Sequence, residues 1–505
     1  MGYARVLSVG LLGLSGRLIE IEADLSSGLP GMILSGLPDA AVNESRERIR
    51  AAVINTGLTW PNRRITVNLL PASVPKHGSL FDLGLAAAVL CAAGVVPVDR
   101  IHGTAVLGEL GLDGQVRPVR GVLPAVLAAS RAGIGRVVVP AGNGREAALV
   151  PGATVRTVDT LAALLDHLRD AVELPGPTTG DLDQPGPVGA DLVDVVGQER
   201  GRRAIEIAAA GGHNLAFFGP PGAGKTMLAE RLPGVLPPLS DEEALEVTAV
   251  HSVAGALPPA AGLVRRPPYQ APHHTSTPAA IVGGGSALPR PGAISLAHRG
   301  VLFLDEAPEY RNGVLNALRE PLENGEIRLA RANGSTSFPA RFQLVLAANP
   351  CPCGERGGDC LCSPLVRRRY LGRLSGPLLD RVDLQLDLLP VRSAQLLIED
   401  GPPEDSATVA ARVRDARASA AARWAGSAGL LNAAIPGRTL RSGRWRLPRT
   451  VTALAERLVD RGSLSARGYD RVLRIAWTVA DLAGRDRPDA GDVAEAVELR
   501  TRTTP

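Results

Sequence analysis

The stretch Gly219-Pro-Pro-Gly-Ala-Gly-Lys-Thr226 fits the pattern G-x-x-x-x-G-K-T, and it decides the fold of the central part of the chain. The apolar run 214–218 before it predicts a buried strand, and residues 227–232 after it predict the start of a helix. A strand, a glycine-rich loop and a helix in this order are the context that a phosphate-binding loop requires. The alternative is a chance glycine-rich turn between a strand and a helix.

Backbone N–H groups of such a loop surround phosphate oxygens at a helix N-terminus. We expect Lys225 to reach the β- and γ-phosphates of ATP and the Thr226 hydroxyl to bind Mg²⁺. Among 55 Lys and Arg residues only Lys76 and Lys225 are lysines, so one of them stands where a compact ammonium group is needed. The predicted nucleotide-binding residues are Gly219, Pro220, Pro221, Gly222, Ala223, Gly224, Lys225, Thr226 and Met227.

Two carboxylates follow a second apolar run, Val301-Leu-Phe-Leu304. This pattern predicts a central parallel strand that places Asp305 and Glu306 at its carboxyl end, where α/β sheets bind ligands. We expect Asp305 to hold Mg²⁺ and Glu306 to polarise the attacking water. The alternative is a buried strand that ends in acidic residues without a catalytic role. A third apolar run leads to the amide of Asn349, where a γ-phosphate or the lytic water would lie.

The composition is that of a soluble globular protein, with 45% hydrophobic and 21% charged residues. A formal net charge of +4 and a pI near 9.0 permit a polyanionic partner without requiring one. Because aromatic residues make up only 3%, broad stacking on nucleic-acid bases is not expected to dominate binding. No apolar run approaches the ~20 residues of a membrane span, and the N-terminus lacks a signal cleavage site, so we expect a cytoplasmic protein.

The chain is predicted to be an α/β protein of several domains. Pro and Gly residues dominate 175–190, which predicts a linker or, alternatively, an ordered strap across a surface. The predicted divisions are an α+β domain over 1–174, this linker, a parallel-sheet nucleotide-binding domain over 191–395 and a helical domain over 396–505.

Four of the five cysteines form a cluster, Cys351-Pro-Cys353 and Cys360-Leu-Cys362. In a chain without a secretory signal, clustered cysteines indicate a metal more often than disulfides. Four thiolates could hold Zn²⁺ in a tetrahedron, while reduced thiols or a redox pair remain the alternative. The fifth, Cys91, lies in an apolar helical stretch and is expected in the core.

Five motifs occur together: the loop 219–226, Ala271-Pro-His-His-Thr275, the run 291–306, Ala347-Ala-Asn-Pro-Cys-Pro-Cys353 and Ser465-Ala-Arg-Gly468. Together they resemble the YifB/ComM family of magnesium-chelatase-like AAA+ ATPases, over nearly the whole chain. The N-terminal part resembles the Lon-protease-type domain of these proteins. The resemblance implies a homo-hexameric ring with ATP bound between subunits, and a helical lid at the C-terminus.

By position in the family motifs, Asn349 would be sensor one, Arg381 the arginine finger for the neighbouring subunit, and Arg467 sensor two. A finger of this kind can contribute ~10³–10⁵ in rate. For Arg381 the alternative is a surface salt bridge to Asp380 or Asp383. For Arg467 it is that Arg471 or Arg474 takes the role, because both lie close in sequence.

ComM-like members resemble DNA helicases that drive branch migration, which implies branched or single-stranded DNA as a partner. The alternating stretch 326–338 with its Asn333-Gly334 turn predicts a β-hairpin, and the family places such hairpins in the ring pore. Arg328 and Arg331 are the candidate DNA contacts, although their opposite parity separates them on a regular strand. A solvated hairpin edge is the alternative. The adjacent residues His273 and His274 are expected to hold a loop in place rather than a metal.

The matching stretch for the Lon nucleophile is Lys76-His-Gly-Ser-Leu-Phe-Asp82, which places Leu80 at the serine position. The stretch matching the catalytic lysine, 121–127, contains no lysine. Ser79 is expected to lack an activating base, so the domain is predicted to be proteolytically inactive. Lys76 is expected to be a surface lysine or a phosphate contact.

An ATP-driven DNA translocase or branch-migration helicase is therefore the favoured function. The alternatives are a motor for magnesium insertion into a porphyrin, an ATP-dependent protease or protein remodeller, and a non-catalytic assembly platform. Leu80 disfavours the protease, and the set Lys225, Thr226, Asp305 and Glu306 disfavours the platform.

Overall fold

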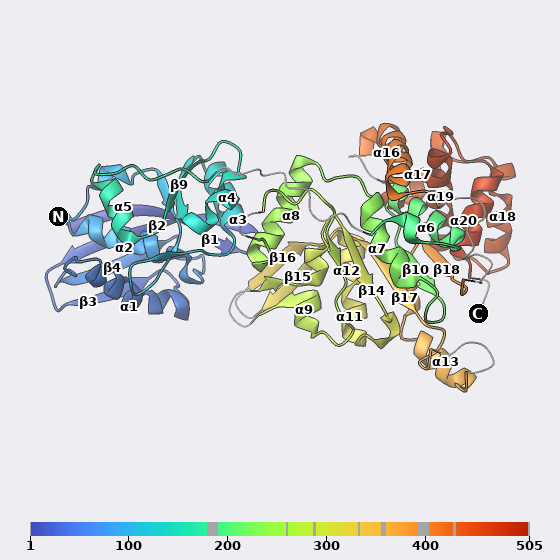
Figure 1. The fold of residues 1–505 in the computed structure, drawn as a ribbon, viewed down its shortest axis with the longest axis horizontal. Helices are drawn as coiled ribbons and strands as arrows, with labels where there is room; N and C mark the ends of the chain where they lie inside the picture. The colour runs from blue at the N-terminus through green and yellow to red at the C-terminus, as the bar shows by residue number, and fades with distance from the viewer. Residues whose placement is uncertain are drawn as a thin grey trace.

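The computed structural model describes residues 2–178, 190–258, 261–285, 289–331, 334–354, 360–391, 403–427 and 431–502. Along the longest axis lie an N-terminal part built on one sheet, a central part built on a second sheet, and a C-terminal group of helices (Figure 1). This arrangement confirms the prediction of an α/β protein of several domains. In the described part of the chain, no helix has the length and apolarity needed to cross a membrane.

The N-terminal part is a seven-stranded mixed sheet in the order β3-β4-β2-β1-β5-β8-β9. Its centre is the long antiparallel hairpin of β1 and β2, in which the buried residues of β2 alternate with more exposed ones. The strands are β1 (Gly2–Leu12), β2 (Ser15–Ser26), β3 (Gly31–Ser35), β4 (Arg64–Leu70), β5 (Thr104–Val106), β8 (Arg136–Pro140) and β9 (Thr154–Val158), with a small hairpin of β6 (Glu109–Leu110) and β7 (Val116–Arg117). The helices are α1 (Ala40–Asn55), α2 (Asp82–Ala92), α3 (Val122–Arg131), α4 (Gly144–Ala148) and α5 (Leu161–Leu168).

Lys76 is fully buried in this part, which corrects the expectation of a surface lysine or a phosphate contact. Its Nζ donates to the carbonyl oxygens of Gly36 at 2.8 Å, Leu69 at 2.7 Å and Pro71 at 2.5 Å. These three carbonyls use all the donors of the ammonium group, and they come from segments that lie apart in sequence. Lys76 is therefore a structural bridge that fixes the loops after β3 and β4.

Two further expectations for this part have clear outcomes. Ser79 was expected to lack an activating base, but its hydroxyl donates to the Glu109 carboxylate, a partner that the sequence analysis did not identify. Leu80 and Cys91 are buried, and burial raises the pKa of the Cys91 thiol to about 11, as suits a core cysteine.

The central part is a five-stranded sheet in the order β11-β14-β17-β10-β18, and all its neighbours pair in parallel. Its strands are β10 (Leu215–Phe218), β11 (Tyr269–Gln270), β14 (Val301–Leu304), β17 (Gln343–Ala348) and β18 (Leu384–Asp387). Strands β10 and β14 are buried along their whole length, as expected for a parallel sheet covered on both faces. The helices are α6 (Glu199–Gly211), α7 (Lys225–Val235), α8 (Asp241–Ala254), α9 (Pro278–Val282), α10 (Ala293–Leu296), α11 (Asn312–Ala317), α12 (Arg319–Asn324), α13 (Pro364–Leu371) and α14 (Gly376–Leu379).

Two short antiparallel pairs form separate two-stranded sheets, β12 (Gly283–Gly284) with β13 (Arg290–Pro291), and β15 (Glu326–Arg331) with β16 (Gly334–Pro339). The predicted hairpin over 326–338 is present, but Arg331 pairs with Gly334, which places Gly334 in the strand rather than in the turn. Asn333 lies outside the described residues. Helix α6 starts at Glu199, two residues after Gly197, whose left-handed backbone with φ of 72° does not continue a right-handed helix.

The N-terminal part docks on the central part through α3 and α8. Ala249 of α8 belongs to the same apolar core as Val122, Ala125 and Ala129 of α3, and the Ser252 hydroxyl donates to Glu146. At the other end of the N-terminal part, Thr157 of β9 donates through its backbone N–H to the Pro175 carbonyl at 2.9 Å. The first residues of the predicted linker thus pack on the N-terminal sheet, while residues 179–189 lie outside the described ranges.

The C-terminal helices are α16 (Ser406–Arg423), α17 (Gly437–Leu440), α18 (Arg449–Asp460), α19 (Ala466–Leu482) and α20 (Ala490–Arg500). Val413 of α16 and Ile475 of α19 share one core with Phe217 of β10 and Leu228 of α7. The helices therefore cover the phosphate-loop side of the central sheet and form the predicted lid (Figure 1).

Candidate nucleotide-binding site

The phosphate loop 219–226 joins β10 to α7, as the sequence predicted. Gly222 and Gly224 have φ of 76° and 83°, in the left-handed region that favours glycine. A Cβ on Gly219 would stand 2.4 Å from the Leu388 carbonyl oxygen, so that position also requires glycine. Gln198, which the sequence interpretation did not single out, supports the loop by donating to the Ala223 carbonyl at 3.0 Å.

Lys225 lies in the first turn of α7 and is nearly buried, with 7% of its surface exposed. Its Nζ donates to the carbonyl oxygens of Gly219 at 2.7 Å and Pro220 at 2.9 Å, and to Asn349 Oδ1 at 3.0 Å. Burial lowers the pKa of Lys225, and the nearby charges of Asp305 and Glu306 oppose this shift. Asn349 follows β17, so the lysine links the phosphate loop to the adjacent strand.

The acid pair follows β14 directly. Thr226 Oγ1 donates to Asp305 Oδ2 at 2.8 Å, and the Glu306 backbone N–H donates to Asp305 Oδ1 at 2.8 Å. A hydroxyl and a carboxylate oxygen at this separation fit Mg²⁺, which takes hard oxygen ligands. Glu306 has a left-handed backbone with φ of 49°, which is strained for a non-glycine residue.

His274 contacts the acid pair, a contact that spacing alone could not reveal. Its Nδ1 lies 3.1 Å from Glu306 Oε2, and its ring meets Tyr310 edge-on with centroids 6.4 Å apart. Its neighbour His273 holds the loop, as expected, with Nδ1 2.7 Å from the Thr275 hydroxyl. The loop before α9 thus places an imidazole beside the carboxylate predicted to polarise water.

The cysteine cluster packs against the phosphate loop. The Cys351 Sγ lies 3.1 Å from that of Cys353 and 3.4 Å from that of Cys360, and all four Sγ atoms, with Cys362, lie within 4.8 Å of one another. A Cβ on Gly354 would stand 3.0 Å from Pro221 Cγ and 3.9 Å from Asn349 Nδ2. The cluster therefore abuts both the loop and the residue predicted as sensor one.

Arg381 is not among the residues that meet at the phosphate loop. Its guanidinium pairs with Glu323 of α12, instead of the suggested Asp380 or Asp383, and donates to the Pro377 carbonyl at 2.5 Å. Asp383 instead pairs with Arg471. Although burial alone would raise the pKa of Asp383, the charge of Arg471 and the nearby His213 imidazole, 3.7 Å away, hold that pKa below its usual range.

Arg467 lies in the first turn of α19 and is exposed, with no hydrogen bond or ion pair to the described residues. Its two competitors are occupied, because Arg471 pairs with Asp383 and Arg474 Nε donates to the Ile435 carbonyl at 2.8 Å. Of these three arginines, Arg467 is therefore the one whose side chain makes no hydrogen bond or ion pair to the described residues.

The candidate DNA contacts lie on β15. Arg328 has 61% of its side chain exposed and pairs with Glu326 on its own strand. Arg331 is the last residue of β15, and its side chain lies outside the described part of the structure.

A phosphate loop, an acid pair and a polar amide at the carboxyl ends of neighbouring parallel strands are typical of the class of P-loop nucleotide-binding proteins. Three family models match the chain: "Magnesium chelatase, subunit ChlI" over residues 191–396, "Subunit ChlI of Mg-chelatase" over 21–143, and "Magnesium chelatase, subunit ChlI C-terminal" over 403–500.

Relatives match over the full length. An uncharacterized protein of Mycobacterium tuberculosis is 55% identical over 502 residues, 99% of each chain. YifB of Escherichia coli is 42% identical over 504 residues, and competence protein ComM of Haemophilus influenzae is 41% identical over 507; each match covers 99% of this chain and 97% or 98% of the relative. The chain therefore belongs to the YifB/ComM family of magnesium-chelatase-like AAA+ proteins. A weaker similarity, 27% identity over 165 residues to the Lon protease of Syntrophomonas wolfei, accompanies its Lon-like N-terminal region.

Proposed function

We propose that this protein is an ATP-hydrolysing hexameric motor that acts on DNA in the cytoplasm, as a branch-migration helicase or translocase. The observation that carries the ATPase part is the meeting of Lys225, Thr226, Asp305, Glu306 and Asn349 at one edge of the central sheet. The proposed domains are 1–174, the linker 175–190, 191–395 and 396–505.

Bound Mg-ATP supplies the phosphoryl group that is transferred to water. Lys225 exchanges its bonds to the loop carbonyls for phosphate oxygens, which is possible because these partners are neutral and lie in the loop itself. Thr226 and Asp305 offer the oxygen ligands for Mg²⁺. Glu306 orients the attacking water, and His274 fixes the position of that carboxylate.

In this proposal the site is completed by a neighbouring subunit. Arg381 leaves Glu323 and serves as the finger for the ATP of the next subunit, while Arg467 acts as sensor two. A guanidinium supplied in this way stabilises charge in the transition state. Support comes from the contacts of Arg381, which lie on α12 and α14 rather than on the phosphate loop of its own chain.

A mixing experiment tests the shared site. Lys225→Ala and Arg381→Ala, each inactive alone, should regain part of the ATPase activity when mixed, because some interfaces then combine an intact loop with an intact finger. Unmixed Arg381→Ala should still bind ATP. A mixture that stays as inactive as its components, although both variants assemble, contradicts the assignment of Arg381.

DNA is proposed as the substrate because a relative at 41% identity over the full length is named a competence protein. Arg328 and Arg331 on the β15–β16 hairpin are the proposed pore contacts. The test is ATP turnover with forked DNA, four-way DNA, a porphyrin with Mg²⁺, or casein. Stimulation by DNA supports the proposal, whereas stimulation by the porphyrin alone would identify a chelatase motor and by casein alone a protein remodeller.

We also propose that the four clustered cysteines bind Zn²⁺. A tetrahedral site with Zn–S bonds of about 2.3 Å has S···S edges of about 3.8 Å, close to the separations in the cluster. The measurement is zinc content of protein purified without chelators, with one ion per chain expected. Cys353→Ser with Cys362→Ser should lose it, and Cys91→Ser should retain it. Metal-free wild type whose four thiols all react with a thiol reagent would establish the reduced-thiol alternative.

A further inference from the structure

The lid carries a strongly basic segment between α17 and α18. Residues 437–450 contain five arginines and no acidic residue, so the charge of this segment alone exceeds the +4 of the whole chain. Arg441 pairs with Asp470 at 3.2 Å. The side chains of Arg438, Arg446 and Arg449 are exposed and make no hydrogen bond or ion pair to the described residues.

Three of the four tryptophans pack together at this segment, and one of them, Trp445, belongs to it. Trp424 and Trp477 are buried, and Trp445 is half-buried with its ring centroid 4.8 Å and 5.8 Å from theirs. The Arg444 guanidinium lies over the Trp445 ring, 4.4 Å from the centroid. The buried pair holds Trp445 in place, so its ring and the guanidinium above it form a rigid, flat surface at the protein exterior.

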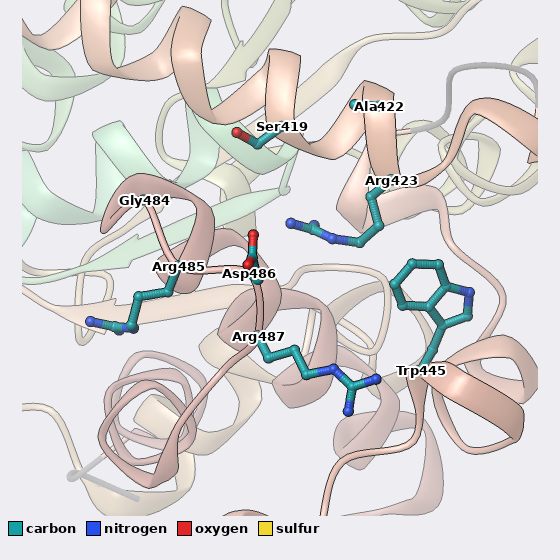
Figure 2. Close-up of a pocket in the computed structure, with 8 residues that line it drawn as sticks. All are labelled: Ser419, Ala422, Arg423, Trp445, Gly484, Arg485, Asp486 and Arg487. Carbon is teal, nitrogen blue, oxygen red and sulfur yellow. The ribbon is translucent and has the colours of Figure 1, made fainter.

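A pocket of about 700 Å³ opens beside this surface, lined by the end of α16, Trp445 and the loop 484–487. Figure 2 shows the Arg423 and Arg487 guanidinium groups and the Trp445 ring on the pocket wall, with Asp486 between the loop and α16. Arg423 is committed to Asp481, and Arg485 to Asp492. Arg487 donates to the Arg444 carbonyl at 2.6 Å and thereby ties the loop to the basic segment.

We infer that this surface binds a single strand of DNA, an inference that rests on the proposed DNA function. Arg438, Arg446 and Arg449 contact the phosphates, and an unstacked base lies against Arg444 and Trp445 at the mouth of the pocket. The Asp486 carboxylate can accept a hydrogen bond from a base amino group. A single strand is favoured over a duplex because the bases of a duplex are already stacked and paired, and an acidic peptide would leave the flat surface unused.

The surface is separate from the hairpin β15–β16 and from the phosphate loop. It lies on the lid, at the end of the molecule opposite the N-terminal part (Figure 1). A strand leaving the motor would therefore be held by a second contact outside the nucleotide site.

The test measures anisotropy of a fluorescent oligo(dT) with the full-length protein over a range of NaCl concentrations. The variant with Arg438→Ala, Arg446→Ala and Arg449→Ala should bind about tenfold more weakly or worse, with the slope of log K against log salt reduced by about 2. The matched control removes the same charge from Arg50, Arg63 and Arg64, which are exposed in the N-terminal part and make no ion pair to described residues. That control should bind like wild type.

Trp445→Phe provides an independent readout, because oligo(dT) should quench tryptophan fluorescence in wild type and much less in this variant. Trp445→Ala should weaken binding by about 5- to 100-fold. Equal binding by wild type and the triple arginine variant overturns the inference alone, whereas wild type that binds no DNA contradicts the proposed function. If inorganic pyrophosphate quenched the fluorescence equally, the ligand of this surface would be a small anion instead of DNA. If polyglutamate competed equally, the ligand would be an acidic peptide.

Discussion

Lys76 and Lys225 are both buried, and each uses its three N–H donors within the protein. In the N-terminal part, Lys76 donates to three backbone carbonyls and is fully enclosed. In the central part, Lys225 donates to two carbonyls of its own loop and to the Asn349 side chain, with two carboxylates nearby. Lys76 contacts segments that the fold fixes, whereas two partners of Lys225 lie on the glycine-rich loop and the third, Asn349, lies at the end of the adjacent strand β17.

A structural ammonium group and one proposed to bind a ligand thus differ in whether a ligand can reach them. Both satisfy the rule that a buried charge must be hydrogen-bonded. In the proposed function, Lys225 gains by exchanging neutral carbonyls for charged phosphate oxygens, whereas Lys76 is fully enclosed and has no access to such a partner. Substitutions at or near the two lysines should therefore affect different properties.

The largest effect is expected for Lys225→Ala. Loss of the ammonium group should weaken ATP binding by on the order of 10³-fold, because no other group among the described residues of the loop carries a positive charge. Calorimetric titration with ATP measures this, and the thermal unfolding midpoint should change little. Unchanged ATP affinity would place the nucleotide elsewhere.

Glu306→Gln is expected to lower kcat by about 10²–10⁴ while ATP remains bound. The amide keeps the size of the side chain but cannot polarise water, so the variant separates binding at Lys225 from hydrolysis. Single-turnover hydrolysis and nucleotide retention are the measurements. Turnover at the wild-type rate would remove the role assigned to Glu306.

Lys76→Ala should leave ATP binding unchanged and lower the free energy of unfolding by about 2–3 kcal/mol. Three carbonyls lose their donor, and the buried one, that of Leu69, is the costliest to leave unsatisfied. Denaturant unfolding followed at Trp60, the tryptophan of the N-terminal part, measures the change. Arg63→Ala, at an exposed position of the same part, is the control. If the variant lost ATP affinity without losing stability, the structural role assigned to Lys76 would be contradicted.

The smallest effect is expected on the pH dependence of stability. It distinguishes the carbonyl partners of Lys76 from the carboxylate of Asp383, the partner of Arg471. The folded-state pKa of Asp383 lies below the 3.8 of the free group, so its stabilising contribution is present above about pH 4 and is lost as the pH falls further. The loss should be about 1.4 kcal/mol per pH unit in that range. The carbonyls around Lys76 do not titrate, so fluorescence of the lid tryptophans should change at a higher pH than that of Trp60. A simultaneous change would contradict this contrast.

Most features of the fold and the candidate site that could be predicted depend on short local patterns in the sequence. The strand, loop and helix around Lys225, the acid pair after β14 and the amide after β17 each depend on a short stretch of sequence, and the structure places these residues together. Contacts between distant segments could not be predicted in this way. Lys76 with Leu69 and Gly36, His274 with Glu306, and Arg381 with Glu323 depend on how whole elements pack, which periodicity does not specify.

The tip of the β1–β2 hairpin touches β16, where a Cβ on Gly13 would stand 2.6 Å from Thr336 Cγ2. Together with the shared core of α3 and α8, this contact joins the N-terminal part to the central part at two points, one on α8 and one on β16. The N-terminal sheet therefore rests on both α8 and the β15–β16 hairpin of the central part. If the proposed motor shifts that hairpin relative to α8, the N-terminal sheet should move with it, which a pair of dyes on the two parts could follow in real time.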